Sequence, residues 1–333
     1  MNELFLFSLV LLFTFLISVM LTKFWIKIAK RASFVGKDMN KANQPEIPEM
    51  GGVVVVFSII IGLLAFIFLK TFLLISETHL VEILAILVTL LLAFFIGFLD
   101  DCTGWKVGLS QLQKVLLTIP IGLPLAVLNA GNSHLFGINF GLLFPLIIVP
   151  VAIIGSSNAM NLLAGYNFLE CGLGIIILST LGIFAFQQGM FWLVAICFIA
   201  VAALSAFGLF NYFPSKVFPG NSLTYAIGAL IGSVAIFGGL EKVALILFIP
   251  YFLDAILYVR ARVIDKAGDV QAFAKVNPDG SLDLPYPKIY DSTHLAIAIL
   301  KKIKRKVYEP DVVNLLIGIE AMIAIIALVI GSL

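Results

Sequence analysis

Asparagine side chains gather in one short stretch of this sequence, between two long apolar runs. The stretch reads NAMNLLAGYNFLE and covers residues 158–170. Asn158 and Asn161 are three residues apart, so on a helix they lie on one face. Amide side chains offer oxygen ligands to Mg²⁺, and both donors and acceptors to the edge of a nucleobase. The pair therefore predicts a metal, phosphate or nucleotide site, whereas Asn167, after a helix-ending Gly165, has an ordinary helix cap as its alternative role.

Two adjacent carboxylates, Asp100 and Asp101, end another apolar run in the sequence FLDDCTGWK. Close to hydrocarbon such a pair is costly unless a cation joins it, which predicts a magnesium or phosphate site. A solvated helix end is the alternative. Neighbouring side chains on a helix point in different directions, so one can meet the metal while the other holds a lysine. Lys114 lies across the following loop and is the candidate lysine, with snorkelling to the interface as its alternative.

A third polar motif, Gly220-Asn221-Ser222, stands where a helix is predicted to begin, after the proline-rich loop NYFPSKVFP. The N-terminus of a helix favours phosphate oxygens. Asn or Ser at that position is equally an ordinary N-cap. The motif alone therefore leaves both roles open.

The elements that position these motifs are membrane spans. Of the 333 residues, 61% are hydrophobic and 12% are charged, where a soluble chain has about 25% charged residues. Apolar stretches of about 20 residues predict an all-α integral membrane protein with about ten transmembrane helices in a single catalytic domain, 1–333. The predicted spans are 4–25, 52–70, 80–99, 112–130, 139–157, 171–188, 190–210, 222–240, 243–259 and 312–331.

The basic residues predict the orientation of this domain. On an alternating path, all but Lys70 and Lys242 of the 21 Lys and Arg residues fall on one side. The positive-inside rule makes that side cytoplasmic and places both termini outside. The polar motifs then lie on the cytoplasmic face, where they indicate an active site. A transporter, the alternative class, more often carries polar groups at mid-membrane on repeated halves.

The longest polar segment, about 260–310, is predicted to be a cytoplasmic loop that begins with Arg260 and Arg262. It runs into LAIAILKKIKRKV, where apolar residues alternate with basic ones at helical spacing. This pattern predicts a basic amphipathic helix on an anionic membrane surface. The apolar stripe consists of Leu295, Ile299, Ile303 and Val307.

In this order the motifs resemble the polyprenyl-phosphate N-acetylhexosamine-1-phosphate transferase superfamily. They look most like its dolichol-linked branch, the UDP-GlcNAc:dolichyl-phosphate GlcNAc-1-phosphate transferases of archaea and eukaryotes. The resemblance covers essentially the whole chain, and the His-rich loop motif of the bacterial peptidoglycan branch is absent from the sequence. The stretches that carry it are GKDMNK…IPEMGGV (36–53), DD (100–101), NAMNLLAGYNFLE (158–170) and FPSKVFPGNS (213–222).

The resemblance implies the first step of lipid-linked oligosaccharide assembly for N-glycosylation. A dolichyl-phosphate oxygen attacks the β-phosphorus of UDP-GlcNAc, or of a related UDP-N-acetylhexosamine, and UMP is released. Mg²⁺, with Mn²⁺ as an alternative, bridges the pyrophosphate. The implied partners are the UDP-sugar, the polyprenyl phosphate, membrane lipid and a second copy in a homodimer, with no nucleic acid. The implied location is the plasma membrane of an archaeon or the endoplasmic reticulum of a eukaryote.

The resemblance also assigns roles to individual residues. It implies catalytic roles for the acidic pair and the lysine, metal binding by two asparagines, and contact with the nucleotide sugar for the others. The catalytic group is Asp100, Asp101 and Lys114, and the metal group is Asn161 and Asn221. The substrate-binding group is Asp38, Glu49, Asn158, Asn167, Arg260, Arg262 and Lys275.

Three departures from the family pattern bear on these roles. The family's GD[ST] motif becomes Gly220-Asn221-Ser222, which keeps an oxygen but loses a negative charge, and magnesium binds chiefly through carboxylates. Weak metal binding and poor turnover are therefore expected, with Asp254 as a compensating carboxylate and a catalytically inactive homologue that binds UDP-sugar or lipid as the alternative function. The loop that carries pyrophosphate-binding arginines in the family has only Lys275, and Phe168 replaces a common glycine.

Overall fold

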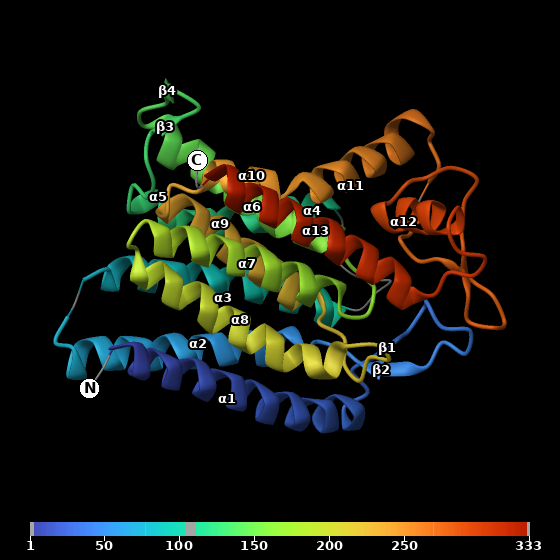
Figure 1. The fold of residues 1–333 in the computed structure, drawn as a ribbon, viewed down its shortest axis with the longest axis horizontal. Helices are drawn as coiled ribbons and strands as arrows, with labels where there is room; N and C mark the ends of the chain where they lie inside the picture. The colour runs from blue at the N-terminus through green and yellow to red at the C-terminus, as the bar shows by residue number, and fades with distance from the viewer. Residues whose placement is uncertain (1–2, 77, 104–110, 269, 332–333) are drawn as a thin grey trace.

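Long helices run side by side through most of the molecule, and a computed structural model gives their arrangement (Figure 1). The structure describes residues 3–76, 78–103, 111–268 and 270–331. Within these residues, seven helices are long and apolar enough to cross a membrane, or eight if one bent pair forms a single span. The helices are α1 (Glu3–Arg31), α2 (Gly52–Phe68), α3 (Leu80–Thr103), α4 (Gln111–Thr118), α5 (Leu123–Val127), α6 (Val149–Leu162), α7 (Leu169–Gln187), α8 (Phe191–Asn211), α9 (Asn221–Phe237), α10 (Glu241–Leu247), α11 (Ile249–Val259), α12 (Ser292–Lys301) and α13 (Glu309–Gly331).

Each of the ten predicted apolar segments is wholly or largely helical, so the all-α membrane fold is confirmed, whereas the number of about ten transmembrane helices stays a prediction beside the seven or eight candidate spans in the described residues. The helices in these segments differ in length, and three of the segments do not form a single long helix. The segments at 112–130 and 222–240 form shorter apolar helical stretches, Leu116–Val127 and Asn221–Phe237. The segment at 243–259 is the bent pair, in which α10 and α11 meet at 58°. Pro250 stands in the first turn of α11 and has no N–H to continue the helix across the break.

Helix α9 lies in the middle of the bundle. From Ser222 to Ile236 every residue of this helix is buried, and it packs against α2, α3, α6, α7 and α10. Apolar or small residues cover all sides of this helix, and a helix of that kind is stable when it is buried on all sides. Its N-terminus therefore opens at one end of the bundle, among the ends of its neighbours.

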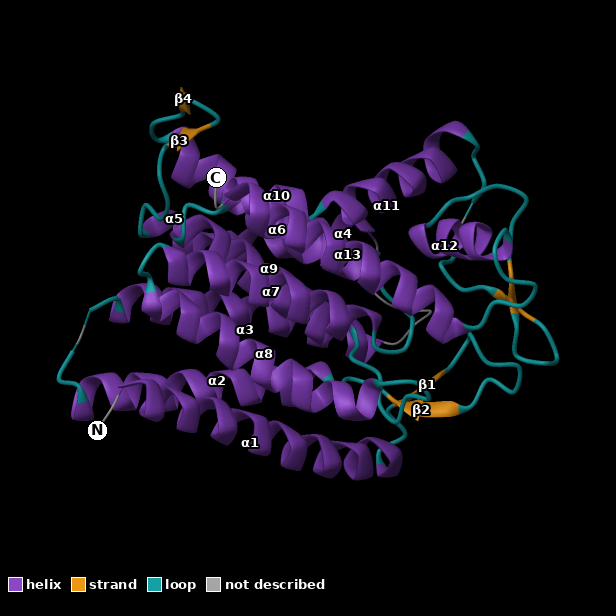
Figure 2. Cartoon of the chain, in the orientation of Figure 1, coloured by secondary structure: helices purple, strands orange, loops and turns teal. Residues whose placement is uncertain are grey.

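Within the described residues, three short antiparallel hairpins lie at the two ends of the bundle (Figure 2). Strand β1 (Val35–Lys37) pairs with β2 (Glu46–Pro48), with Gly36 opposite Ile47. Strand β5 (Lys275–Val276) pairs with β6 (Leu282–Asp283) near the same end. Strands β3 (His134–Leu135) and β4 (Ile138–Asn139) lie at the other end, where both chain termini are found.

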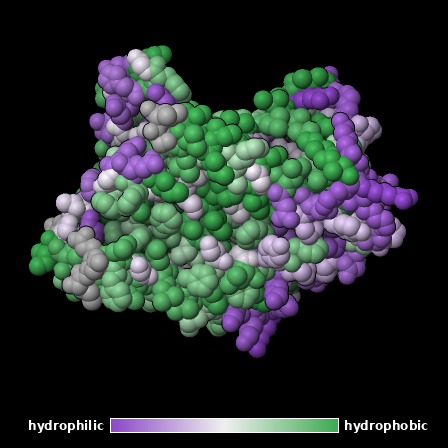
Figure 3. All heavy atoms as spheres, viewed as in Figure 1, coloured by the Kyte–Doolittle hydropathy of each residue, from purple (hydrophilic) through white to green (hydrophobic). Residues whose placement is uncertain are grey.

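Hydrophilic side chains gather at the end that carries β1, β2 and α12, while the flank of the bundle is largely apolar (Figure 3). A second, smaller hydrophilic area covers the β3–β4 hairpin. An apolar flank between two polar ends is the surface expected of helices in a bilayer. The identity of the cytoplasmic end stays a prediction.

The predicted amphipathic helix at 295–307 is wrong in its extent. Helix α12 ends at Lys301 and buries Ala296, Ile297 and Leu300 against the protein. In the predicted apolar stripe, Ile299 and Ile303 are 39% and 78% exposed while Val307 is buried, and contact of this stripe with a membrane surface stays a prediction. Helix α12 begins where Asp291 Oδ1 accepts a hydrogen bond from the Thr293 N–H at 2.7 Å. Packing against neighbouring segments, which sequence periodicity cannot report, selected the buried face.

Candidate active site

The last turn of α3 meets the N-terminus of α9, although 120 residues separate them. Asp101 Oδ1 accepts the Asn221 N–H at 2.7 Å, and its Oδ2 accepts the Ser222 N–H at 2.9 Å. Gly220 precedes this turn with φ 73° and ψ 173°, a conformation that essentially only glycine adopts. Asp101 thus caps α9 from another helix, and it occupies two N–H groups that a phosphate would otherwise use.

The two asparagines predicted to bind metal lie beside the acidic pair. The Asn221 amide donates from Nδ2 to Asp100 Oδ2 at 2.8 Å. Asn161, on α6, donates from Nδ2 to Asn221 Oδ1 at 2.6 Å and to Thr224 Oγ1 at 2.9 Å. Asp100 is buried, while Asp101, Asn161 and Asn221 are half-buried. The structure therefore brings four of the predicted site residues into one hydrogen-bonded cluster.

Glycines allow the helices of this cluster to approach closely. A Cβ atom at Gly97 of α3 would lie 2.6 Å from the Asn221 carbonyl carbon. A Cβ atom at Gly52, the first residue of α2, would lie 2.6 Å from Ser222 Oγ. These two glycines permit α2 and α3 to converge on the start of α9, which fixes where the acidic pair meets Asn221.

Glu49 adds a third carboxylate near the cluster, from the loop between β2 and α2. Burial raises its pKa, and the negative charge of Asp101 raises that pKa further. The Glu49 side chain lies over Gly36, where any side chain would overlap it. The neighbourhood of Asp101 is thus acidic, and a cation or a protonated carboxyl would relieve the repulsion.

The donors present suit a magnesium ion only in part. Within the described residues, no group of three or more His, Cys, Asp and Glu side chains could hold a metal by itself. Asp100 offers a carboxylate, and Asn161 and Asn221 offer amide oxygens. Magnesium is commonly held by one or two carboxylates together with substrate phosphates and water. The cluster fits such an ion when phosphate oxygens complete the ligand set.

Asp38 and Asn167 also meet, but in a separate ion-paired network. Asn167 donates from its N–H to Glu309 Oε1 at 2.8 Å and from Nδ2 to Asp38 Oδ2 at 3.3 Å. Lys41 Nζ lies 3.1 Å from Asp38 Oδ2 and pairs with Glu309. Asp38, Asn167 and Glu309 are buried. The described contacts of both predicted residues are therefore with protein groups.

Sequence reasoning missed Lys41 and Glu309, the two members that hold this network together. Lys41 lies within GKDMNK, so its motif offered a signal, and its ammonium also stands 4.4 Å from the centre of the Phe213 ring. Glu309 begins α13, more than 260 residues away from Lys41. Nothing in the local sequence around Glu309 points to a buried ion pair, so only the fold could reveal it.

Phe168 adopts a left-handed conformation, φ 72°, just before α7. This backbone favours glycine, the residue expected at this position from the resemblance. Its N–H donates to Asn211 Oδ1 at 3.1 Å, and its ring fills the space beside Gly208, where a Cβ would lie 2.7 Å away. Asn158, also predicted to contact substrate, donates from Nδ2 to the Ile154 carbonyl of its own helix at 2.8 Å.

Three predicted substrate-binding residues lie in the predicted loop 260–310. Arg260 Nε is 3.4 Å from Asp265 Oδ2, and the Arg262 guanidinium lies 5.5 Å from the Tyr258 ring centre. Lys275 is exposed and lies opposite Asp283 in the β5–β6 hairpin. These described contacts join the three residues to their own segment, and their role in gripping pyrophosphate stays a prediction.

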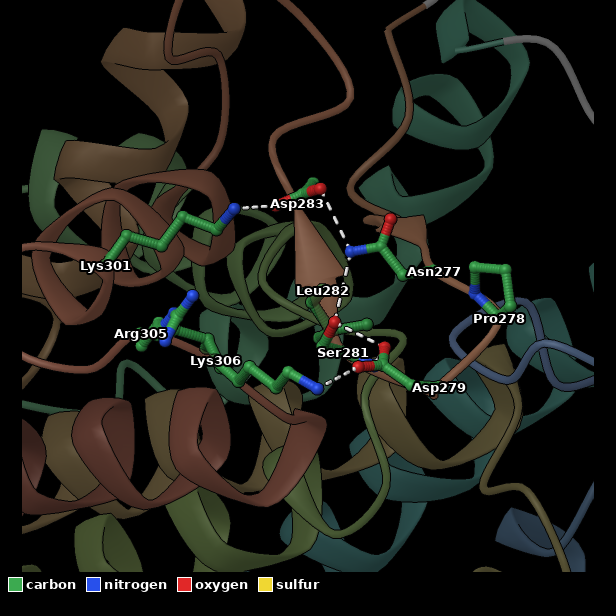
Figure 4. A pocket seen from close by; sticks show the side chains of 10 residues that line it. Asn277, Pro278, Asp279, Ser281, Leu282, Asp283, Lys301, Arg305 and Lys306 are labelled. Atoms are coloured by element: carbon green, nitrogen blue, oxygen red, sulfur yellow. Dashed lines mark hydrogen bonds and ion pairs between the residues drawn. The ribbon is translucent and has the colours of Figure 1, made fainter.

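A surface pocket of about 450 Å³ lies beside that hairpin (Figure 4). Two of its three cationic side chains pair with carboxylates: Lys301 pairs with Asp283, and Lys306 Nζ lies 2.7 Å from Asp279 Oδ2. Lys306, together with Ser281, holds the pKa of Asp279 well below its usual range. These two ion pairs join the β5–β6 hairpin to the end of α12 and the segment after it.

Lys114 and Asp254 are the other two residues to which the sequence analysis assigned a role. Lys114 lies in α4, and its side chain is outside the part of the chain that the structure describes, as are residues 104–110 of the same motif. Asp254 Oδ1 accepts the Ser292 N–H at 2.6 Å and so holds the start of α12. This contact gives Asp254 a structural task, and compensation for Asn221 stays a prediction.

Comparisons with known proteins give the family of this chain. A model of glycosyl transferase family 4 matches residues 83–239, which contain the acidic pair, the asparagine stretch and Asn221. A Saccharolobus solfataricus protein is 36% identical over 97% of this chain and 96% of its own length, and it is provisionally named UDP-N-acetylglucosamine–dolichyl-phosphate N-acetylglucosaminephosphotransferase. A Sulfolobus acidocaldarius protein with the same name is 31% identical over 95% of this chain and 93% of its own. A phospho-N-acetylmuramoyl-pentapeptide-transferase from Lactobacillus helveticus is 33% identical over 62% of this chain and 63% of its own. The two archaeal relatives cover nearly the whole chain, and the family model matches the region that contains the cluster, so this membrane protein belongs to glycosyl transferase family 4.

Proposed function

We propose that this protein transfers GlcNAc-1-phosphate from UDP-GlcNAc to dolichyl phosphate and releases UMP. The observation that carries the proposal is the cluster of Asp100, Asp101, Asn161 and Asn221 at the polar end of a membrane bundle. Such a site can meet a lipid phosphate from the bilayer and a nucleotide sugar from water. The names of the two archaeal relatives support the choice of substrates.

In this reaction an oxygen of dolichyl phosphate forms a bond to the β-phosphorus of UDP-GlcNAc. The bond from that phosphorus to the oxygen bridging the α-phosphate breaks, and UMP leaves with the electron pair. The second pKa of a phosphate monoester is about 6, so the attacking oxygen is already mostly ionised at neutral pH. Positioning and charge neutralisation are therefore the main tasks of the protein, and no aspartate needs to remove a proton.

The residues of the cluster divide these tasks. Asp101 fixes the start of α9 through two backbone N–H groups, and so positions Asn221. Asp100, Asn161 and Asn221 would hold Mg²⁺, with Mn²⁺ as an alternative ion. The bound ion supplies positive charge that offsets the phosphates and the acidic pair. Asn221 in place of a carboxylate weakens this binding, so turnover is expected to be slow.

The setting of the reaction follows from the same features. The polar end with β1, β2 and α12 is proposed to be the cytoplasmic face, because nearly all basic residues fall on that side of the predicted path. The archaeal relatives favour the plasma membrane. The product would enter lipid-linked oligosaccharide assembly for N-glycosylation, and a homodimer is the assembly expected of the family.

A second candidate function rests on Asn221. A homologue that binds UDP-GlcNAc or the lipid without catalysis would keep the cluster but lack the carboxylate that the family pattern implies at position 221. Binding without UMP release, both for this chain and for Asn221→Asp, would favour this role.

The test is UMP release from UDP-GlcNAc in the presence of dolichyl phosphate and Mg²⁺. Asp100→Asn should abolish release, because it removes the buried carboxylate of the cluster. Asp283→Asn is the matched control, since Asp283 is an acid of the β5–β6 hairpin paired with Lys301. Equal activity of the two variants would overturn the assignment of the site, and absence of UDP-GlcNAc binding to the folded protein would overturn the function.

A further inference from the structure

The loop between β1 and β2 carries a buried amide that joins two distant segments of the chain. Asn40 is buried, and its side chain bonds backbone groups at both polar ends. Its Nδ2 donates to the Gly165 carbonyl at 3.3 Å, and its Oδ1 accepts the Ala274 N–H at 3.2 Å. These partners lie 125 and 234 positions away along the chain. The amide therefore connects the asparagine stretch 158–170 to the residues just before β5.

The Gly165 end of this bridge is itself fixed. The Gly165 N–H donates to Glu170 Oε1 at 2.7 Å, and Glu170 is buried in the first turn of α7. The Phe273 ring lies beside Gly165, where a Cβ atom would be 3.4 Å from it. Asn167, two residues further on, donates to Asp38 Oδ2 at 3.3 Å. Asp38 belongs to the same β1–β2 loop as the bridging amide, so this loop holds the asparagine stretch at two points.

The other end of the bridge lies in the short stretch 272–274, which further side chains hold against the protein. Thr293 Oγ1, in the first turn of α12, donates to the Ala272 carbonyl at 2.9 Å. Tyr166 Oη, from the asparagine stretch, donates to the same carbonyl at 3.4 Å. The stretch is thus docked on the asparagine stretch by the tyrosine and by the amide of the β1–β2 loop.

We propose that Asn40 is a positioning residue for UDP-GlcNAc that acts through Lys275, an inference that rests on the proposed function. Lys275 directly follows Ala274 and is exposed, and it is the candidate cation for the pyrophosphate. The bridge sets the place of its backbone relative to Asn167, the second candidate substrate contact. A long, flexible ammonium side chain loses less freedom on binding when its backbone is already fixed, so the bridge raises the affinity for the nucleotide sugar.

The test measures the Kd of UDP-GlcNAc for the purified full chain with Mg²⁺, together with UMP release at saturating UDP-GlcNAc. Asn40→Ala should raise the Kd about ten-fold, the effect expected of two lost hydrogen bonds. UMP release at saturation should change by less than about two-fold, because the pyrophosphate is held in both the ground state and the transition state. A purely structural role would lower the melting temperature and leave the Kd of the folded protein unchanged. Asn40→Ser is the second variant, since one hydroxyl cannot replace the separate donor and acceptor of the amide.

A double-mutant cycle tests whether Asn40 acts through Lys275. Lys275→Met alone should raise the Kd about ten-fold, and its combination with Asn40→Ala should also raise it about ten-fold rather than about 100-fold, because both changes remove the same contact. Asn277→Ala is the matched control in the same segment. It removes two amide hydrogen bonds, to Ser281 Oγ and Asp283 Oδ2, that stay within the β5–β6 hairpin, so the Kd should be unchanged.

The outcomes separate this inference from the proposed function. An unchanged Kd in the folded Asn40 variants, additive effects in the cycle, or an equal rise in Asn277→Ala would overturn the role of Asn40 and leave the proposed function intact. Absence of UDP-GlcNAc binding by the original folded chain would overturn the proposed function, and this inference with it.

Discussion

Replacing Asn221 by aspartate perturbs the centre of the candidate active site. The Asn221 amide now donates to Asp100 Oδ2 at 2.8 Å. An aspartate in the same position would bring two carboxylates to that spacing and remove a hydrogen bond. Coulomb repulsion at 2.8 Å is about 6 kcal/mol for an effective dielectric constant of 20 and about 1.5 kcal/mol in bulk water. Without a cation, the variant should therefore be less stable than the original chain.

A divalent cation should reverse this loss, because it binds between the two carboxylates. If binding recovers about 3 kcal/mol, magnesium affinity rises about 100-fold, since every 1.4 kcal/mol is tenfold. The assay is thermal melting in EDTA and across a magnesium titration, together with UMP release. We expect Asn221→Asp to melt below the original chain in EDTA, to recover with Mg²⁺, and to release UMP faster.

Asn158→Asp is the matched control for this experiment. It makes the same chemical change on the adjacent helix α6, but the Asn158 amide donates to a backbone carbonyl and not to a carboxylate. Its melting should depend little on magnesium. If both variants show the same melting temperature in EDTA and the same response to Mg²⁺, the metal role assigned to position 221 is refuted.

Three other perturbations test the surroundings of the cluster. Lys41→Met leaves Asp38 and Glu309 buried without their cation, so we expect the free energy of unfolding to fall by about 3–5 kcal/mol. Lys41→Arg should restore part of this loss. Equal melting temperatures of the two variants would contradict the expectation. Burial and the charge of Asp101 raise the pKa of Glu49 from 4.5, so the folded state favours the protonated carboxyl. The stability that this preference contributes is fully present below pH 4.5 and is lost as the pH rises through the raised pKa. Glu49→Gln should flatten that part of the melting profile, and an unchanged slope would count against the burial of this charge. Gly220→Ala should lower the free energy of unfolding by about 1–3 kcal/mol, because φ of Gly220 is 73° and the new Cβ would lie 2.6 Å from Asp101 Oδ2. An unchanged midpoint of denaturant unfolding would show that the turn tolerates a side chain.

The sequence analysis was wrong about the extent of the amphipathic helix at 295–307. Apolar residues at helical spacing and a basic run suggested a helix to residue 307, but α12 stops at Lys301 and buries Ala296, Ile297 and Leu300 against the protein. The periodicity of a short segment allows more than one buried face. Contacts from neighbouring segments, such as Asp254 with the Ser292 N–H, decide between them.

The sequence alone determined the membrane class, the positions of the ten apolar helical segments and the residues most able to do chemistry. These are local properties, because about 20 consecutive apolar residues and a carboxylate pair are visible without the fold. Only the tertiary structure decided that Asp101 caps α9, that Asn221 bonds Asp100, and that Lys41 pairs with Glu309. Each of these contacts joins residues more than 100 positions apart. Their partners are set by helix packing at small residues such as Gly97, and no local pattern records which distant group fills the space.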